Sequence, residues 1–326
     1  MVGGILFGSL ALLLLLNVPI AVALGLASFF AMIFGDMSIP LTVVPQRIFT
    51  SIDSFPFMAV PFFMLAGALM ETGGISRRLV SFAKSLVGFL PGGLAIITVV
   101  SSGFFGAISG SNAATVAAIG GIMIPSMVKE KYPKDYACAV AAAGGTLGVV
   151  VPPSVPMITY GVISGVSIGT LFLAGFVPAL LMIISMCTVI LVSARKAGLP
   201  SERTSLQELW TSFVEAIFAI LMPVIVLGGI YGGVFTPTEA AAVSCVYALI
   251  VTMLVYREIT VSDLYDVILK SCQSTAVVFF IIATSGVFSW LLTAQRIPDA
   301  IAATILNTSQ DRFAVLFLIN MLLLVL

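Results

Sequence analysis

The sequence predicts an all-α membrane protein whose helices cross the bilayer many times. Of its 326 residues, 60% are hydrophobic and only 9% are charged, and the mean hydropathy is +1.21. A soluble globular chain carries roughly 25% charged residues, so a water-soluble fold cannot bury this much apolar surface. The apolar stretches repeatedly reach the roughly 20 residues that a helix needs to cross the hydrocarbon.

Composition also excludes several classes of protein and site. A transmembrane β-barrel is disfavoured because barrel strands alternate apolar and polar residues, whereas 10–16 and 21–34 are apolar on every face. The net charge is zero and there is no basic run, so we expect the lipid bilayer and not nucleic acid as a partner. Histidine, the commonest metal ligand and general base, is absent. The four cysteines form no C-x-x-C pair and are expected to be packing residues.

The apolar segments predict the helices in order. The first, 5–34, is interrupted by Asn-Val-Pro at 17–19, and we favour one kinked helix over two short ones. The next two are 55–70 and the region that starts after Pro-Gly-Gly at 91–93 and runs to 127. The later apolar segments are 136–151, 168–192, 213–234, 239–255, 274–292 and 313–326.

The last apolar segment and the basic loops bear on organisation and orientation. The segment 313–326 offers only 14 residues and has no polar flank, so we expect one transmembrane domain, 1–326, that is C-terminally incomplete. Basic residues gather at 77–84 and 195–203, which the positive-inside rule places in the cytoplasm.

Small and hydroxyl-bearing residues fill 101–115 at membrane depth. A tight helix interface is one explanation. Ser-Gly-Ser-Asn at 109–112, however, combines glycine with cap-forming residues, which ends one helix and begins another. We therefore favour a broken helix, which must face protein or a water-filled cavity. Its free carbonyls can bind Na⁺, and the start of the following half-helix can hold an anion.

A second break is predicted at 144–154, GGTLGVVVPPS. Adjacent prolines donate no backbone hydrogen bonds and leave carbonyls near 148–151 free, although a simple proline kink is the alternative. Two such breaks, about 40 residues apart, indicate a transporter binding site. The candidate substrate-binding residues are Ser111, Asn112, Ala113, Thr115 and Ser154, and the candidate Na⁺ ligands are Ser109, Asn112, Gly145, Gly148 and Val151.

The motif Thr-Pro-Thr-Glu at 236–239 predicts a helix start. Thr236 would be the N-cap, Pro237 the first helical residue and Glu239 the acid of a capping box. The alternative is that Glu239 is a proton or cation site, because carboxylates at membrane depth are commonly functional.

Together the motifs resemble the large membrane subunit of tripartite ATP-independent periplasmic (TRAP) transporters, of the DctM or SiaM type. They are NVPIAVALG at 17–25, VPFFMLAG at 60–67, GAISGSNAATVAAIG at 106–120, PPS at 152–154 and FTPTEAAA at 235–242. The resemblance implies a multi-pass protein of a bacterial or archaeal cytoplasmic membrane. It implies a Na⁺-coupled importer of organic acids such as C4-dicarboxylates or sialic acid.

The resemblance also implies partners and a fold. A periplasmic binding protein of the DctP or SiaP type would deliver substrate to this chain and to a small four-helix subunit of the DctQ or SiaQ type. The fold would be an inverted-repeat, elevator-type transporter with a re-entrant hairpin at 103–127 and a broken helix at 136–165. A second repeat would start within 213–326, with its own hairpin and broken helix expected beyond Leu326.

Other classes of function fit the sequence less well. An intramembrane enzyme is disfavoured, because no histidine base is present and the aspartates fall at span ends or in loops. An ion-coupled carboxylate carrier that needs no binding protein is the stronger alternative, and a channel or a purely structural subunit is a further one. The sequence thus predicts a transport subunit rather than an enzyme.

Overall fold

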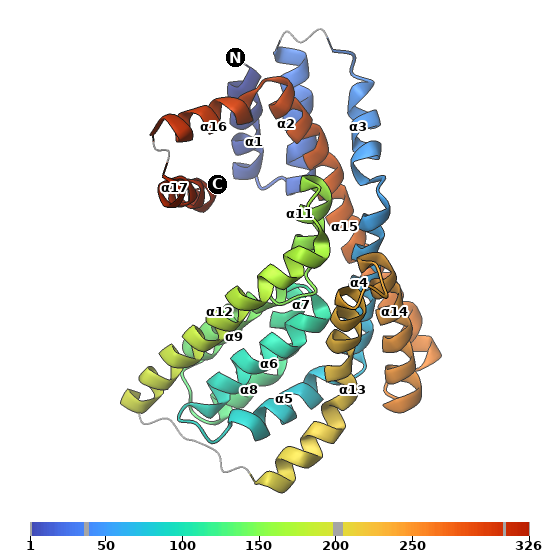
Figure 1. Ribbon diagram of the computed structural model, residues 1–326, viewed down its shortest axis with the longest axis vertical. Coiled ribbons are helices and arrows are strands. Elements are labelled where there is room, and N and C mark those ends of the chain that lie inside the picture. Colours follow the sequence, from blue (N-terminus) through green and yellow to red (C-terminus); the bar gives the residue numbers. More distant parts are fainter. Residues whose placement is uncertain (1, 36–38, 198–204, 309–310, 326) are drawn as a thin grey trace. The chain divides into compact units, whose positions relative to one another are not determined.

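A computed structural model of the chain describes residues 2–35, 39–197, 205–308 and 311–325 (Figure 1), so 198–203 of the second basic stretch lie outside the described residues. Every regular element in these ranges is a helix, which confirms the all-α prediction. The chain divides into two compact units, 54–275 and 1–53 with 276–326. The predicted single domain and the second repeat from residue 213 stay predictions.

The first apolar region forms two helices, so the prediction of one kinked helix was wrong. Helix α1, Val2–Leu15, and helix α2, Ile20–Phe34, pack against each other in the unit of 1–53 and 276–326 (Figure 1). Asn17 has a left-handed φ of 59°. The amides of Asn17 and Val18 bond to the carbonyls of Leu14 and Leu13, both at 3.0 Å. This is the Schellman pattern that ends a helix, and Pro19 then precedes α2 instead of kinking a continuous one.

The same unit contains three further helices and part of a fourth. They are α3, Val43–Ile52, α16, Ile297–Thr308, α17, Arg312–Val325, and the residues of α15, Val261–Ala294, from 276 onward. Leu6 of α1, Ala27 of α2 and Leu291 of α15 are fully buried together. The rings of Phe7 and Phe288 meet edge to face at 5.8 Å between centroids. Apolar packing therefore joins the α1–α2 pair to α15.

The unit of 54–275 contains most of the helices. After a 3₁₀ turn at Phe55–Met58 come α4, Ala59–Thr72, α5, Ile75–Val87, α6, Gly93–Ser109, and α7, Asn112–Thr115. A π turn at Val116–Gly120 leads into α8, Gly121–Lys129. The remaining helices are α9, Lys134–Gly145, α10, Leu147–Val150, α11, Val155–Ser164, α12, Ile168–Ala197, α13, Leu206–Tyr231, and α14, Pro237–Leu249, which continues as a π turn, Ile250–Val255.

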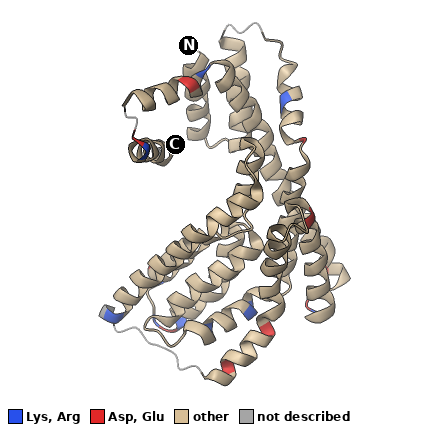
Figure 2. Cartoon of the chain, in the orientation of Figure 1, with Lys and Arg blue, Asp and Glu red and all other residues tan. Residues whose placement is uncertain are grey.

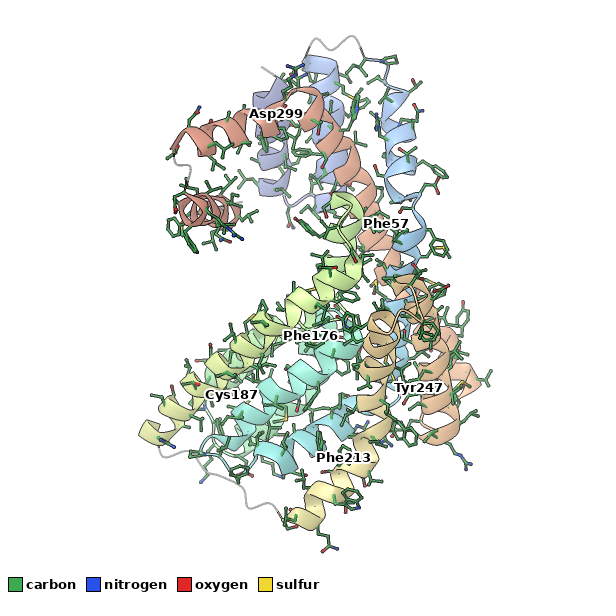
Figure 3. The ribbon with its side chains drawn as sticks, viewed as in Figure 1. Phe57, Phe176, Cys187, Phe213, Tyr247 and Asp299 are labelled. Atoms are coloured by element: carbon green, nitrogen blue, oxygen red, sulfur yellow. The ribbon has the colours of Figure 1, made fainter. Side chains whose placement is uncertain are left out.

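Two sets of contacts organise this unit. Helix α6 packs against α5, α9 and α12, while α14 packs along α4 and α13. The Cys245 thiol of α14 donates to the Phe62 carbonyl of α4 at 2.9 Å. The hydroxyl of Tyr247, which is labelled in Figure 3, donates to the Phe218 carbonyl of α13 at 2.7 Å. Phe213 of α13 packs on Phe82 of α5, with 5.7 Å between ring centroids. Helix α6 is thus enclosed by α5, α9 and α12, and α14 is held against α4 and α13.

Seven helices among the described residues are long and apolar enough to cross a membrane. They cover Phe55–Thr72, Asn112–Lys129, Lys134–Ser164, Ile168–Arg195, Leu206–Tyr231, Pro237–Val255 and Val261–Ala294. Several begin earlier than the apolar segments predicted, because polar residues form their first turns: α13 starts at residue 206 rather than 213, and α15 at 261 rather than 274. Apolar length therefore locates the spans but not their ends.

The predicted capping box at the start of α14 is confirmed. The Thr236 hydroxyl accepts the Glu239 amide at 3.3 Å, and the Glu239 carboxylate accepts the Thr236 amide at 2.8 Å and its hydroxyl at 2.9 Å. Pro237 occupies the first helical position, where no intrahelical donor is needed. The carboxylate of Glu239 is thus engaged at a helix end, which supports the structural reading of this residue.

Thr236→Ala is expected to destabilise the protein by roughly 1 kcal/mol, because it removes the acceptor for an α14 amide that has no intrahelical partner. Thr236→Ser keeps that acceptor and should match the wild type. Thermal unfolding in detergent measures both. Thr188→Ala, on the exposed face of α12, is the control, since its hydroxyl bonds only the Ile184 carbonyl of its own helix. Equal stability of Thr236→Ala and Thr236→Ser would contradict the capping role.

Candidate functional site

The first predicted break lies between α6 and α7. Helix α6 ends at Ser109, and Gly110 follows with φ 60° while its amide bonds to the Gly106 carbonyl at 3.0 Å. Glycine takes this left-handed conformation without the steric cost of a side chain. Ser111 is extended, and its hydroxyl accepts the Ala114 amide at 3.4 Å as the N-cap of α7. The helix therefore stops and restarts within two residues.

Oxygen atoms converge on the inner side of this break. Thr115 is fully buried, and its hydroxyl donates to the Ser111 carbonyl at 2.8 Å. The Ser109 hydroxyl lies 3.1 Å from the Thr115 hydroxyl and 3.4 Å from the Ser111 carbonyl. Two hydroxyls and a main-chain carbonyl thus share one buried location.

The second predicted break lies between α10 and α11. Val151 is extended, Pro152 and Pro153 follow, and α11 begins after Ser154. Ser154 is fully buried, and its hydroxyl donates to the Val149 carbonyl at 2.6 Å. It therefore satisfies a carbonyl at the end of α10 and does not cap α11.

The two breaks lie directly against each other. A Cβ on Gly106 would lie 3.0 Å from the Gly148 Cα, and a Cβ on Gly148 would collide with the Ser111 carbonyl and the Thr115 hydroxyl. The Gly110 carbonyl accepts the Val155 amide at 3.5 Å. The backbone of each break therefore fills the space that a side chain on the other would need.

Most of the predicted site residues meet at this contact. Ser109, Ser111 and Thr115 form the hydroxyl cluster, Gly148 packs on it, and Ser154 follows the prolines beside Gly110. A Cβ on Gly145 would lie 3.5 Å from the Asn112 carbonyl, so Asn112 approaches through its main chain.

The remaining predicted residues lie outside the hydroxyl cluster. The residues Asn112 and Ala113 are exposed. Val151 is buried within the second break, and its amide bonds to the Leu147 carbonyl at 2.9 Å.

Two glycines of the site were not among the predicted substrate-binding residues and Na⁺ ligands, although Gly110 lies in the predicted break. Gly110 supplies the left-handed turn and the carbonyl that reaches α11. Gly67 of α4 allows that helix to approach the break, since a Cβ there would lie 3.1 Å from the Ser109 Cα. Glycine inside an apolar helix costs stability relative to alanine. An interior glycine such as Gly67 therefore indicates that another backbone approaches the helix closely at that position.

The site contains no charged side chain. Neither 101–128 nor 136–164 includes Asp, Glu, Lys or Arg, and no group of three or more metal-binding His, Cys, Asp or Glu side chains occurs among the described residues. A cation held here would be bound by neutral carbonyl and hydroxyl oxygens, which are suitable ligands for a hard ion of low charge. An anion would meet amides at the start of a half-helix.

The chain is similar in sequence to known membrane transporters. The family model of the tripartite ATP-independent periplasmic transporter, DctM component, matches residues 7–326. The isethionate TRAP transporter permease protein DctMQ of Oleidesulfovibrio alaskensis is 44% identical over 98% of this chain and 51% of its own length. The chain therefore spans about half of that relative.

Two further relatives are covered more fully. The C4-dicarboxylate TRAP transporter large permease protein DctM of Rhodobacter capsulatus is 38% identical over 98% of this chain and 76% of its own length. The sialic acid TRAP transporter large permease protein SiaM of Vibrio cholerae is 39% identical over 99% of this chain and 75% of its own length. All three are named as transporter permeases, which agrees with the prediction of a transport protein rather than an enzyme. The chain, with its paired helix breaks, belongs to the DctM component family of tripartite ATP-independent periplasmic transporters.

Proposed function

We propose that this chain is the substrate-moving membrane subunit of a Na⁺-coupled importer of small organic acids. One observation carries the proposal: two helix breaks, separated in sequence, pack backbone to backbone around buried hydroxyls and carbonyls. At membrane depth, irregular backbone is tolerated where it is buried in protein or lines a cavity, and transporters use such breaks to bind ions and anionic groups.

Na⁺ is assigned to the side of the contact where oxygen atoms converge. Ser109 and Thr115 supply hydroxyls, and Ser111 supplies a carbonyl that both hydroxyls approach. The main-chain oxygens of Asn112, Gly145, Gly148 and Val151 complete the set of candidate ligands. Seven neutral oxygens are more than a small monovalent ion needs, so a subset of them suffices.

The acid group of the substrate is assigned to the half-helix ends. Helix α11 begins in the site, and the Ser154 side chain does not cap it because its hydroxyl bonds Val149. Val155 donates to Gly110, Pro156 has no amide hydrogen and Ile158 donates to Ser154, so the Met157 amide is the donor that an acid group can use there. Ser111 and Thr115 and the exposed residues Asn112 and Ala113 would support this contact. The relatives are named for isethionate, C4-dicarboxylate and sialic acid, which share a negatively charged acid group. We propose a carboxylate or sulfonate substrate of this kind.

Two partners and a location complete the proposal. A small four-helix membrane subunit of the DctQ or SiaQ type and a periplasmic binding protein of the DctP or SiaP type would assemble with this chain in a bacterial or archaeal cytoplasmic membrane. The combined designation DctMQ of one relative supports the membrane partner. The seven helices of the described residues that are long and apolar enough to cross a membrane support the multi-pass membrane location.

Uptake by the whole transport system, reconstituted in liposomes, tests the proposal. Radiolabelled C4-dicarboxylate, sialic acid and isethionate are offered with a Na⁺ gradient, a K⁺ gradient or no gradient, with and without the binding protein. We expect uptake of one acid only with inward Na⁺ and the binding protein. Uptake without the binding protein would favour the independent carrier, and equal uptake with K⁺ would contradict Na⁺ coupling.

Ser111→Ala tests the site within this assay. It removes the N-cap acceptor of α7, which costs about 0.5–2 kcal/mol, together with one candidate substrate contact. Uptake should therefore fall by about tenfold or more, while the amount inserted in the membrane stays unchanged. Ser126→Ala in α8 is the matched control, since its hydroxyl bonds only the Ile122 carbonyl of its own helix. Wild-type uptake by Ser111→Ala would contradict the assignment.

A further inference from the structure

A separate charged cluster lies at one end of the unit of 54–275. Figure 2 shows charged residues, coloured on the ribbon, along α5, in the first part of α13 and at the end of α12, away from the two helix breaks. Charged residues of a membrane protein concentrate where the helices leave the hydrocarbon. This end of the unit is therefore at the level of the lipid headgroups.

Arg78 of α5 organises this cluster. Its guanidinium pairs with the Glu258 carboxylate at 2.7 Å, donates to the Gly74 carbonyl at 3.1 Å and lies 3.8 Å from the centre of the Tyr256 ring. The Tyr256 hydroxyl donates to the Glu215 carbonyl of α13 at 2.7 Å. Burial raises the pKa of Tyr256, so this hydroxyl remains a donor at neutral pH. The cluster thus holds α5, α13 and the segment after α14 in fixed positions.

A pocket of about 440 Å³ opens on this cluster, within the size range of small-ligand sites. Two arginines and two glutamates line it, so its side chains carry no net charge; the lining residues are Gly74, Arg77, Arg78, Ser81, Glu215, Tyr256 and Glu258. Arg78 and Glu258 neutralise each other. Arg77 and Glu215 are exposed and make no ion pair with another described residue. The pocket therefore presents one available positive group and one available negative group.

This arrangement matches a ligand with a phosphate and an ammonium on one short linker. Guanidinium groups bind phosphate oxygens through parallel N–H bonds, and the Ser81 hydroxyl can add a donor. A carboxylate accepts hydrogen bonds from a primary ammonium. A purely anionic headgroup would leave Glu215 repelled, and a quaternary ammonium has no N–H to donate to it.

We propose that this pocket binds a phosphoethanolamine group, carried by a phosphatidylethanolamine lipid, with the phosphate on Arg77 and Ser81 and the ammonium on Glu215. The already paired Arg78 and Glu258 form the rigid wall of the site. Because the helix breaks are not involved, this site is independent of the ion and substrate site. A lipid bound here would join α5 to α13 at the membrane surface.

Native mass spectrometry of the purified chain tests the proposal. The protein is delipidated and then equilibrated with phosphatidylethanolamine, phosphatidylcholine or phosphatidylglycerol of identical acyl chains. We expect preferential retention of phosphatidylethanolamine by about tenfold, as one well-formed charged contact provides. Arg77→Gln should lower this retention by about tenfold, and Arg77→Lys should restore part of it. Glu215→Gln should remove the preference over phosphatidylglycerol.

Controls separate the site from general lipid binding and from loss of fold. Lys134→Gln removes a positive charge from an exposed residue that does not line the pocket, and should leave the preference unchanged. An unchanged midpoint of thermal unfolding shows that each variant is folded. Soluble glycerophosphoethanolamine identifies the source of the ligand: competition only at high concentration supports the lipid, whereas tight binding without lipid supports a soluble ester at the same site. A preference for phosphatidylethanolamine that neither Arg77→Gln nor Glu215→Gln lowers would overturn the proposal.

Discussion

Gly148→Ala is expected to raise strongly the Na⁺ concentration that uptake requires. The added Cβ would collide with the Ser111 carbonyl and the Thr115 hydroxyl, which are both proposed Na⁺ or substrate contacts. The carbonyl belongs to backbone, so relief requires the two breaks to separate. Overpacking of this kind costs about 1–3 kcal/mol, equivalent to a roughly ten- to hundredfold loss of ion affinity if the site opens.

Uptake as a function of Na⁺ concentration, together with thermal unfolding, measures the effect. Gly121→Ala is the matched control, because it introduces the same methyl group into α8 where no atom lies within 4 Å of the new Cβ. That variant should transport normally. Normal Na⁺ dependence in Gly148→Ala would show that the contact between the breaks is not the ion site.

The positions of the breaks could be predicted from local sequence. Glycine flanked by serine and asparagine stops and restarts a helix through caps that involve residues only a few positions apart, and Gly110 and Ser111 form them as expected. Paired prolines also act locally, because they lack the amide hydrogens that a helix needs. The chain is accordingly extended at Val151, just before them. Such features depend on neighbours in the chain, so the sequence carries them directly.

The contact between the breaks could not be predicted in the same way. That Gly148 packs on Ser111 depends on how α6, α9 and α12 lie together, which local patterns do not specify. The pairing of Arg78 with Glu258 is likewise a long-range contact, which the basic group at 77–84 does not indicate by itself. Long-range packing fixes these geometries after the helices have formed.

For the first apolar region, the rule that proline kinks a helix led to the wrong prediction of one kinked helix. Proline interrupts a helix either by kinking it or by standing before a new one, and its position alone does not decide between these outcomes. Asn17 decides it, because its left-handed conformation reverses the chain and α2 returns along α1. Asparagine tolerates this conformation better than other residues with a Cβ, so Asn17 was the informative residue.

Thr115→Val is expected to weaken Na⁺ binding while preserving the shape of the buried site. Valine fills the volume of threonine but cannot donate to the Ser111 carbonyl at 2.8 Å or meet the Ser109 hydroxyl at 3.1 Å. Loss of one buried hydroxyl partner costs roughly 1–3 kcal/mol, so the half-saturating Na⁺ concentration should rise by about tenfold. Thr115→Ser retains the hydroxyl and should stay within about threefold of the wild type.

The comparison with a second buried threonine makes this result specific. Thr252 is also fully buried, and its hydroxyl bonds the Ala248 carbonyl of its own helix at 2.7 Å. Thr252→Val therefore carries the same chemical change and a similar cost in stability, but should leave the Na⁺ dependence of uptake unchanged. An equal rise in half-saturating Na⁺ in both valine variants would attribute the effect to general destabilisation. A rise confined to Thr115→Val, and reversed in Thr115→Ser, would require the Thr115 hydroxyl itself to stabilise the ion-bound state.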